Sequence, residues 1–387
     1  MRRTWLVVLV LTLVLSGCWN RRELETLGII IGAGYDWDPE AEEYVVTAQM
    51  ARPAALRLEG GGGGGSTSHV FVGRGKTVFD ASRNLSLVAT RKLWWGHVQV
   101  VVVGEEAAKR GLLGALNFMQ RDGETRTIYW LLVTPGRAAD VLRQKASPET
   151  IPALGLSSLM RTAGATSFAP AVRLLDVLRQ LESPSAVLVA TVNVVEGQGR
   201  GDGQRAQEYR LEGSAVFRAD KLVGYLNLHE TRGVLWLRSK VRSGIIPVPC
   251  QGATDRHVSV EIVNTATFTN PYLDQKGHPA MRALVRMEGN VGDQDCLSRF
   301  DRLEEVERLE QRVMDAIQAE IGQGLKACRK LEADCFGFGT RIAQEMPQVW
   351  KRLEKEWPEP LMEMRVTVDY DVTVRATGAE LRPAKSK

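Results

Sequence analysis

Fold class is decided by the stretch HVQVVVVGEEAAKRGLL, residues 97–113 of a chain of 387 residues. Its first seven residues are mostly valine and predict a buried strand, and Glu105–Leu113 predicts a helix directly after Gly104. The order then repeats, because Thr127–Val133 predicts a strand and Ala138–Lys145 a helix. Alternating strands and helices are typical of a mixed α/β domain.

The alternation continues on both sides of this stretch. Further strands are predicted at Leu27–Ala33, Tyr44–Met50, His69–Gly73 and Ser185–Glu196, and further helices at Thr77–Val88 and Pro170–Leu181. We therefore expect an N-terminal mixed α/β domain over residues 27–200. The six-glycine run Gly60–Gly65 loses the most backbone entropy on ordering and buries nothing. We expect a mobile loop there, at residues 59–66, with a domain linker as the alternative.

A second region is expected over residues 205–387. Four glycines within Gly197–Gln204 predict either a domain boundary or a long hairpin tip before it. The longest helical signal of the chain follows at Phe300–Leu331, and its apolar face holds Leu303, Val306, Val313, Ile317, Ile321, Leu325 and Cys328. This region forms either one unit or two, divided near residues 270–280. The chain is thus expected to be an α+β or mixed α/β protein of two to three domains, with helices packed on mixed sheets.

The N-terminus has the layout of a bacterial lipoprotein signal. Arg2 and Arg3 precede the apolar run Trp5–Leu15, which ends in Leu15-Ser16-Gly17-Cys18. We expect residues 1–17 to be a signal peptide that is cut after Gly17, a lipid on the Cys18 thiol, and a tether at residues 18–26. A membrane span is disfavoured, because the run has about 11 residues where a spanning helix needs roughly 20. An ordinary secretory signal and a chance cysteine remain as alternatives.

Composition and cysteine content limit the remaining classes. The chain is 44% hydrophobic and 25% charged, with a net charge of +4, which is typical of a folded globular protein. Basic and acidic residues are interspersed, so no nucleic-acid surface is expected. Four cysteines besides Cys18 are present: Cys250, Cys296, Cys328 and Cys335. Outside the cytoplasm they could form disulfides in three pairings or stay as buried thiols, and their spacing does not favour zinc.

Short motifs that suggest chemistry are incomplete. Gly32-Ala33-Gly34 lacks the third glycine of a dinucleotide site, and Gly75-Lys76-Thr77 lacks the first glycine of a phosphate loop, so Thr77 is expected to cap a helix. His229-Glu230 lacks the second histidine of a zinc protease. The carboxylates of Asp36 and Asp38 are expected in a turn, where calcium is a weak alternative. We expect no catalytic, cofactor or metal site.

Several segments resemble the Ger(x)C family of spore germination lipoproteins. They are Gly17-Cys18-Trp19 with Arg22-Glu23-Leu24, Gly28–Asp36, His97–Gly104, Glu212–Phe217 with Lys221–Gly224 and Glu230–Gly233, and Asp334–Gly339 with Pro347, Trp350 and Trp357. Their order covers nearly all of the mature chain. The glycine run and the four downstream cysteines depart from the family pattern.

The resemblance implies a non-enzymatic subunit of a germinant receptor. Family members lie on the outer face of the inner spore membrane and act with two membrane-embedded partner subunits, in a complex that senses nutrients. The resemblance therefore implies a lipid-anchored protein that acts in assembly or signalling, whose partners are those subunits and the bilayer. Two alternatives remain open from the residues alone: a solute-binding lipoprotein of a transporter and an envelope enzyme.

Overall fold

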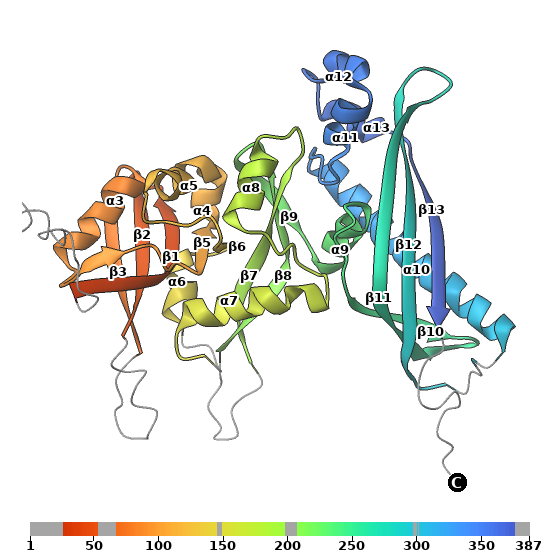
Figure 1. Ribbon diagram of the computed structural model, residues 1–387, viewed down its shortest axis with the longest axis horizontal. Coiled ribbons are helices and arrows are strands. Elements are labelled where there is room, and N and C mark those ends of the chain that lie inside the picture. The colour runs from red at the N-terminus through yellow and green to blue at the C-terminus, as the bar shows by residue number, and fades with distance from the viewer. Residues whose placement is uncertain are drawn as a thin grey trace, which may run out of the picture.

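The computed structural model describes residues 26–52, 67–144, 149–197, 207–296, 300 and 302–375. Two sheets lie along the long axis of the molecule, and helix α9 lies between them (Figure 1). The expected signal peptide, Cys18, most of the tether, the glycine run and the C-terminal tail lie outside the described residues.

The first sheet has the strand order β3-β2-β1-β5-β6-β7-β8-β9, with β4 paired to β1. Pairing is parallel at its centre, from β1 through β5 and β6 to β7, and antiparallel toward both edges. Its strands are β1 (Leu27–Asp38), β2 (Glu43–Ala51), β3 (Ser68–Gly75), β4 (Lys92–Trp94), β5 (Val100–Gly104), β6 (Trp130–Thr134), β7 (Val187–Glu196), β8 (Gln207–Arg218) and β9 (Lys221–Leu226). The strand predicted at residues 97–103 is β5, whose valines are all buried, as a parallel strand covered on both faces requires.

Helices cover both faces of this sheet. They are α3 (Val78–Asn84), α4 (Glu105–Arg110), α5 (Leu112–Arg121), α6 (Ala138–Arg143), α7 (Pro152–Thr162) and α8 (Leu174–Leu181). The helices α3, α4, α5 and α8 share a core with Val101 and Val103, while α6 and α7 share the opposite core with Val100 and Val102. The single helix expected at Glu105–Leu113 is two helices, because Gly111 between them has φ of 138°, which breaks the helical backbone.

The expected boundary at residues 200–205 falls between two paired strands. Strand β7 pairs with β8 in antiparallel fashion, and β8 pairs with β9, so the first sheet continues to Leu226. The connection at residues 198–206 lies outside the described residues. The division of the chain into domains at this point stays a prediction.

The second sheet has the order β10-β11-β12-β13. Its strands are β10 (Gly244–Cys250), β11 (Ala253–Leu273), β12 (Pro279–Gln294) and β13 (Val366–Arg375), and β13 runs parallel to β12. The accompanying helices are α9 (Leu228–Leu237), α10 (Leu303–Lys330), α11 (Phe338–Glu345), α12 (Pro347–Leu353) and α13 (Glu359–Glu363). The chain is therefore a mixed α+β protein with two mixed sheets, as predicted.

Helix α10 is the long helix that the sequence predicts, and it packs along the second sheet (Figure 1). Val313, Ile317, Ile321 and Cys328 of its predicted apolar face are buried. Leu303 is the first residue of α10 and is 74% exposed, and the first buried residue of this helix is Leu309. The expected core role of Cys328 is therefore correct, and that of Leu303 is wrong.

Candidate functional site

Helix α9 begins with a reciprocal cap. The Asn227 side chain accepts the N–H of Glu230 at 2.9 Å, and the Glu230 carboxylate accepts the N–H of Asn227 at 2.8 Å. This arrangement satisfies two N–H groups that have no partner within the helix. The cap fixes where the helix begins. It places Thr231 beside Ser214 of the first sheet, at 3.0 Å between the hydroxyl oxygens, and Arg232 and Gly233 against α10.

Arg232 forms a buried ion pair with Glu320 of α10. Its side chain is 2% exposed, and its Nε donates to Glu320 Oε2 at 2.8 Å and to Oε1 at 3.1 Å. Trp236 Nε1 donates to the same carboxylate at 3.0 Å, and His229 Nδ1 lies 3.2 Å from it. Because each Glu320 oxygen accepts hydrogen bonds, the desolvated carboxylate is compensated. We call this cluster, with Phe168 added below, the Arg232 junction.

The Arg232 junction also contacts the segment that joins two helices of the first half, α7 and α8. The guanidinium lies 4.2 Å from the ring centroid of Phe168, which belongs to the segment between α7 and α8. Its Nη1 donates to the carbonyl of Ile245 in β10 at 3.2 Å. Beside it, Ser167 Oγ donates to the Ser243 carbonyl at 2.7 Å. One arginine therefore contacts segments from both halves of the chain.

Arg238, at the end of α9, makes a second connection between the halves. It donates to the Ala186 carbonyl at 2.8 Å, to Gln180 Oε1 at 2.9 Å, and to the Cys335 carbonyl. Burial lowers the pKa of Arg238, and the nearby Asp334 carboxyl opposes that effect. These three acceptors come from the residue just before β7, from α8 and from the segment before α11, so Arg238 joins segments that are far apart in sequence.

A hollow of about 790 Å³ lies on the first half, between α3 and α5. Tyr44, Phe79 and Phe118 line it together with Arg83, Arg110 and Arg121. The Arg110 guanidinium stacks 3.7 Å from the Trp37 ring, and Arg83 lies 5.1 Å from Phe79. Among the described residues, no carboxylate forms an ion pair with Arg83, Arg110 or Arg121. One carboxylate, that of Asp122, also lines the hollow, and the arginines outnumber it. The volume is in the range of small-molecule sites, and the lining suits an anionic group on an apolar body.

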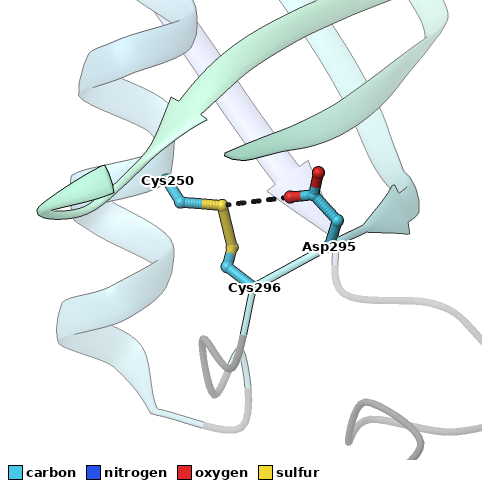
Figure 2. Close-up of side chains that lie close together, drawn as sticks. All are labelled: Cys250, Asp295 and Cys296. Atoms are coloured by element: carbon cyan, nitrogen blue, oxygen red, sulfur yellow. Dashed lines mark hydrogen bonds between the residues drawn. A yellow bond between two sulfur atoms is a disulfide. The ribbon is translucent and has the colours of Figure 1, made fainter. Parts of the chain in front are cut away.

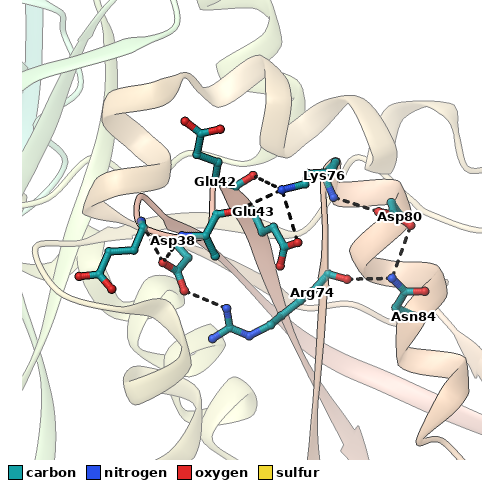
Figure 3. A network of polar contacts seen from close by, with 9 residues as sticks. Asp38, Glu42, Glu43, Arg74, Lys76, Asp80 and Asn84 are labelled. Atoms are coloured by element: carbon teal, nitrogen blue, oxygen red, sulfur yellow. Dashed lines mark hydrogen bonds and ion pairs between the residues drawn. The ribbon is translucent and has the colours of Figure 1, made fainter.

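A polar network fixes one wall of this hollow (Figure 3). Lys76 Nζ donates to the carbonyls of Ala41 and Glu42 at 3.1 and 3.4 Å and pairs with Glu43. The Lys76 N–H donates to Asp80, and Asn84 donates to the Arg74 carbonyl at 2.8 Å. This network ties the β1–β2 turn to the start of α3. Thr77 caps α3, as the sequence predicts, by accepting the Asp80 N–H at 3.1 Å.

Comparison with known proteins identifies the family. The model of the spore germination protein N-terminal domain matches residues 20–194, and the model of the spore germination B3/GerAC-like C-terminal domain matches residues 212–378. The chain belongs to the GerAC family of spore germination proteins. The predicted Ger(x)C membership is thereby confirmed.

Curated relatives of this GerAC chain have its full length. Spore germination protein KC of Bacillus subtilis (strain 168) is 26% identical over 99% of this chain and 98% of its own. Spore germination protein B3 of the same organism is 24% identical over 95% and 96%. The crystal structure of the GerBC protein superposes with a TM-score of 0.58 at 19% identity, covering 89% of this chain and 96% of its own, which supports the fold.

Two of the segments that carried the GerAC resemblance have structural roles. Glu230–Gly233 forms the start of α9 and contains the buried Arg232. In Asp334–Gly339, Asp334 Oδ1 accepts the N–H groups of Phe336, Gly337 and Phe338, and Oδ2 accepts that of Gly339 at 2.7 Å. Burial raises the pKa of Asp334, whereas these hydrogen bonds and Arg238 lower it. The segment is thus a capped turn at the start of α11.

The four downstream cysteines fall into two kinds. Cys250 and Cys296 form a disulfide that joins β10 to the segment just after β12, and Asp295 Oδ1 lies 3.7 Å from the Cys250 sulfur (Figure 2). Cys328 and Cys335 are fully buried free thiols. Burial raises the pKa of Cys328 well above that of an exposed thiol. Of the predicted alternatives, the structure therefore contains one disulfide and one pair of buried thiols.

The carboxylates at the end of β1 do not lie together in a turn. Asp36 is buried within β1, and its two oxygens accept the N–H groups of Ala138 and Ala139 at 2.7 and 3.0 Å, which caps α6. Asp38 pairs with Arg74 at 2.8 Å. The expectation of a turn at Asp36 is wrong, because strand β1 continues past Gly34. Calcium is not needed, since Asp36 already has two donors.

The sequence did not single out Glu320, Phe168 or the arginines of the hollow. Glu320 carried a usable signal, because it lies on the apolar face of α10 beside Ile321, where a carboxylate needs a buried donor. Phe168 and Arg110 carried no such signal in the sequence.

Among the described helices, none is both long and apolar enough to cross a bilayer. Cys18 and Gly17 lie outside the described residues.

Proposed function

We propose that this chain is a lipid-anchored subunit of a spore germination nutrient receptor, which acts in assembly or signalling and not as an enzyme. The observation that carries the proposal is the match to germination proteins B3 and KC over nearly the whole chain. The lipoprotein-type signal at Leu15–Cys18 supports the anchor on the outer face of the inner spore membrane. The membrane-embedded receptor subunits are the proposed partners.

The Arg232 junction gives this subunit a physical means of signalling. A partner that moves one sheet would move α9, because Arg232 and Arg238 bind groups from both halves. Close-packed, hydrogen-bonded contacts pass such displacements on, whereas a loose linker would absorb them. The subunit would then act as a stiff connection between the membrane side and the rest of the receptor.

Replacement of the lipidated cysteine tests the anchor. We expect Cys18→Ala to release the protein from the membrane fraction and to weaken the germination response to nutrients. The matched control replaces residues 1–18 with a membrane-spanning helix, which should restore both readouts. A normal nutrient response from the released protein would contradict membrane anchoring as part of the mechanism.

Crosslinking in dormant spores tests the partners. Recovery of permease-like receptor subunits with this chain would support the proposal. Recovery of a transport ATPase would instead favour a solute-binding lipoprotein.

The arginine-lined hollow is the observation that favours this second function. Calorimetry of the isolated chain with amino acids and sugars should show no binding for an assembly subunit. Binding that is lost in Arg110→Ala would support a ligand-binding role. No observation on the described residues favours the envelope enzyme.

A further inference from the structure

Exposed apolar side chains gather with arginines on α3 and the turn that follows it. Phe79, Leu87 and Val88 are 51%, 83% and 57% exposed. Phe79, Arg83 and Leu87 follow one another at intervals of four residues, so they share one face of the helix and its extension. Arg91 is exposed just beyond. We name Phe79, Arg83, Leu87, Val88 and Arg91 the α3 patch.

The α3 patch lies beside the point where the chain enters the fold. Strand β4, which begins at Lys92, pairs in parallel with the first residues of β1, Leu27–Ile29. A side chain at Gly28 would place its Cβ 3.6 Å from Arg91 Cβ. The end of the patch is therefore in contact with the first described strand.

The tether limits how far this surface lies from the proposed anchor. Nine peptide steps join Cys18 to Leu27, and they span at most about 32 Å when fully extended. If Cys18 carries the lipid, as proposed above, Leu27 and the adjacent end of the α3 patch stay within that distance of the bilayer. The effective concentration of lipid headgroups at the patch is then high, so weak contacts are sufficient for docking.

The side chains of the patch match the interface of an anionic bilayer. Aromatic and aliphatic groups enter the boundary between headgroups and acyl chains, while arginines bind anionic headgroups. Arg83 and Arg91 form no ion pair with a described carboxylate, so both are available for phosphate groups. Lys92 is engaged by Glu124 at 3.3 Å and contributes less.

We propose that the α3 patch is the surface by which this protein contacts an anionic membrane. The lipid holds the chain at the bilayer, and the patch orients it, so that the first sheet lies near the membrane and the second sheet projects from it. Figure 1 shows α3 at one end of the long axis and the second sheet at the other. The proposal rests on lipidation of Cys18.

The test places an environment-sensitive fluorophore on Leu87→Cys in the lipidated chain, bound to vesicles of phosphatidylglycerol. The exposed thiol alone should be labelled, because Cys328 and Cys335 are fully buried and Cys250 and Cys296 are paired. Leu303→Cys is the matched control, since Leu303 is also an exposed leucine, 74% accessible, but lies on α10. We expect a blue shift at position 87 and none at position 303.

Charge reversal supplies the second readout. Arg83→Glu combined with Arg91→Glu should abolish the blue shift at position 87 while the protein still sediments with the vesicles. Vesicles of phosphatidylcholine alone should give at most half of the shift. If position 87 behaves like position 303 in sedimenting protein, the patch proposal is overturned although anchoring stands.

Two further results distinguish membrane contact by the α3 patch from failure of the lipid anchor and from contact with a protein partner. Failure of the lipidated chain to sediment would count against the anchor itself. A blue shift that appears only when receptor subunits are added would mean that a protein covers the patch, which also overturns contact with lipid.

Discussion

Gly233 of α9 lies directly against the backbone of Glu320 in α10. A methyl group at Gly233 would stand 1.9 Å from the Glu320 carbonyl oxygen. On the other helix, a methyl group at Gly324 would lie 3.2 Å from the carbonyl carbon of Gly233. The two glycines therefore permit the close crossing of α9 and α10, on which the Arg232–Glu320 pair depends.

Gly233→Ala should destabilise the protein because backbone atoms cannot yield as a flexible side chain can. Overpacking of this kind costs about 1–3 kcal/mol or more. Urea unfolding monitored by circular dichroism measures the loss. Gly322→Ala on the partner helix α10 is the control, since a methyl group there would meet no described atom within 4 Å. That change should stabilise α10 by about 0.5–1 kcal/mol. Equal effects of the two substitutions would contradict the close crossing.

Removal of one partner of the buried ion pair should cost more than removal of a surface partner. Arg232→Met leaves the Glu320 carboxylate buried without its cation, which costs about 3–5 kcal/mol. Arg218→Met is the control, because its pair with Glu332 is half exposed and contributes about 1 kcal/mol or less. The double change to Met at 232 and 320 should recover much of the stability. If Arg232→Met and Arg218→Met had the same effect in urea unfolding, the junction would not be important for stability.

The local sequence pattern predicts the helices and strands of this fold better than it predicts the tertiary contacts between them. The valines of β5 and the alternation around them identified the layered first half, because burial on both faces leaves a continuous apolar run. Strand β10 was not predicted, since Pro247 and Pro249 demote a strand signal and are tolerated here at a sheet edge. Helix α7 was not predicted either, because Gly155 and two serines weaken its helical signal.

The candidate site was less predictable than the fold. Arg232 and Glu320 are 88 residues apart in the chain, and no local pattern joins them. For the first sheet, the glycines of 197–204 left a domain boundary and a hairpin tip as alternatives, and the antiparallel pairing of β7 with β8 agrees with the hairpin. Local pattern could not choose between them, since strand pairing depends on tertiary packing. The family resemblance pointed to Glu230–Gly233 as a recognisable segment, but its burial came only from the structure.

The contributions of Asp36 and Asp38 to the free energy of unfolding should depend on pH in opposite ways. Burial raises the pKa of Asp36, so the native state binds the proton more tightly than the unfolded state. Its contribution to stability is then present at low pH and is lost as the pH rises above 3.8 toward the raised value. Arg74 lowers the pKa of Asp38, so that contribution is present above pH 3.8 and is lost as the pH falls.

Stability curves of Asp36→Asn and Asp38→Asn against pH measure this difference. For each variant, the free energy of unfolding is subtracted from that of the wild type at the same pH. Plotted against pH, the two differences should have slopes of opposite sign. Asp36→Asn should also lose about 1–3 kcal/mol at every pH, because its amide faces the N–H group of Ala138 or Ala139. Slopes of the same sign would show that Asp36 is not desolvated.

Thiol counting should separate the three kinds of cysteine. In the folded, lipidated chain a disulfide reagent should find no reactive thiol, since Cys328 and Cys335 are fully buried and burial raises the pKa of Cys328. Denaturant should expose these two, and reduction should then release Cys250 and Cys296. No thiol in the denatured chain would mean that Cys328 and Cys335 are paired.

The same count reports on the anchor. In denaturant, a mature chain that retains Cys18 without lipid should show three reactive thiols, that of Cys18 together with those of Cys328 and Cys335. Lipidation converts this sulfur into a thioether and removes it from the count. Leu87→Cys supplies the positive control, because an exposed thiol at that position must react in the folded chain. Full reaction of Leu87→Cys, with only Cys328 and Cys335 reacting besides it in denaturant, would therefore mean that the Cys18 thiol is modified, whatever the membrane fraction shows.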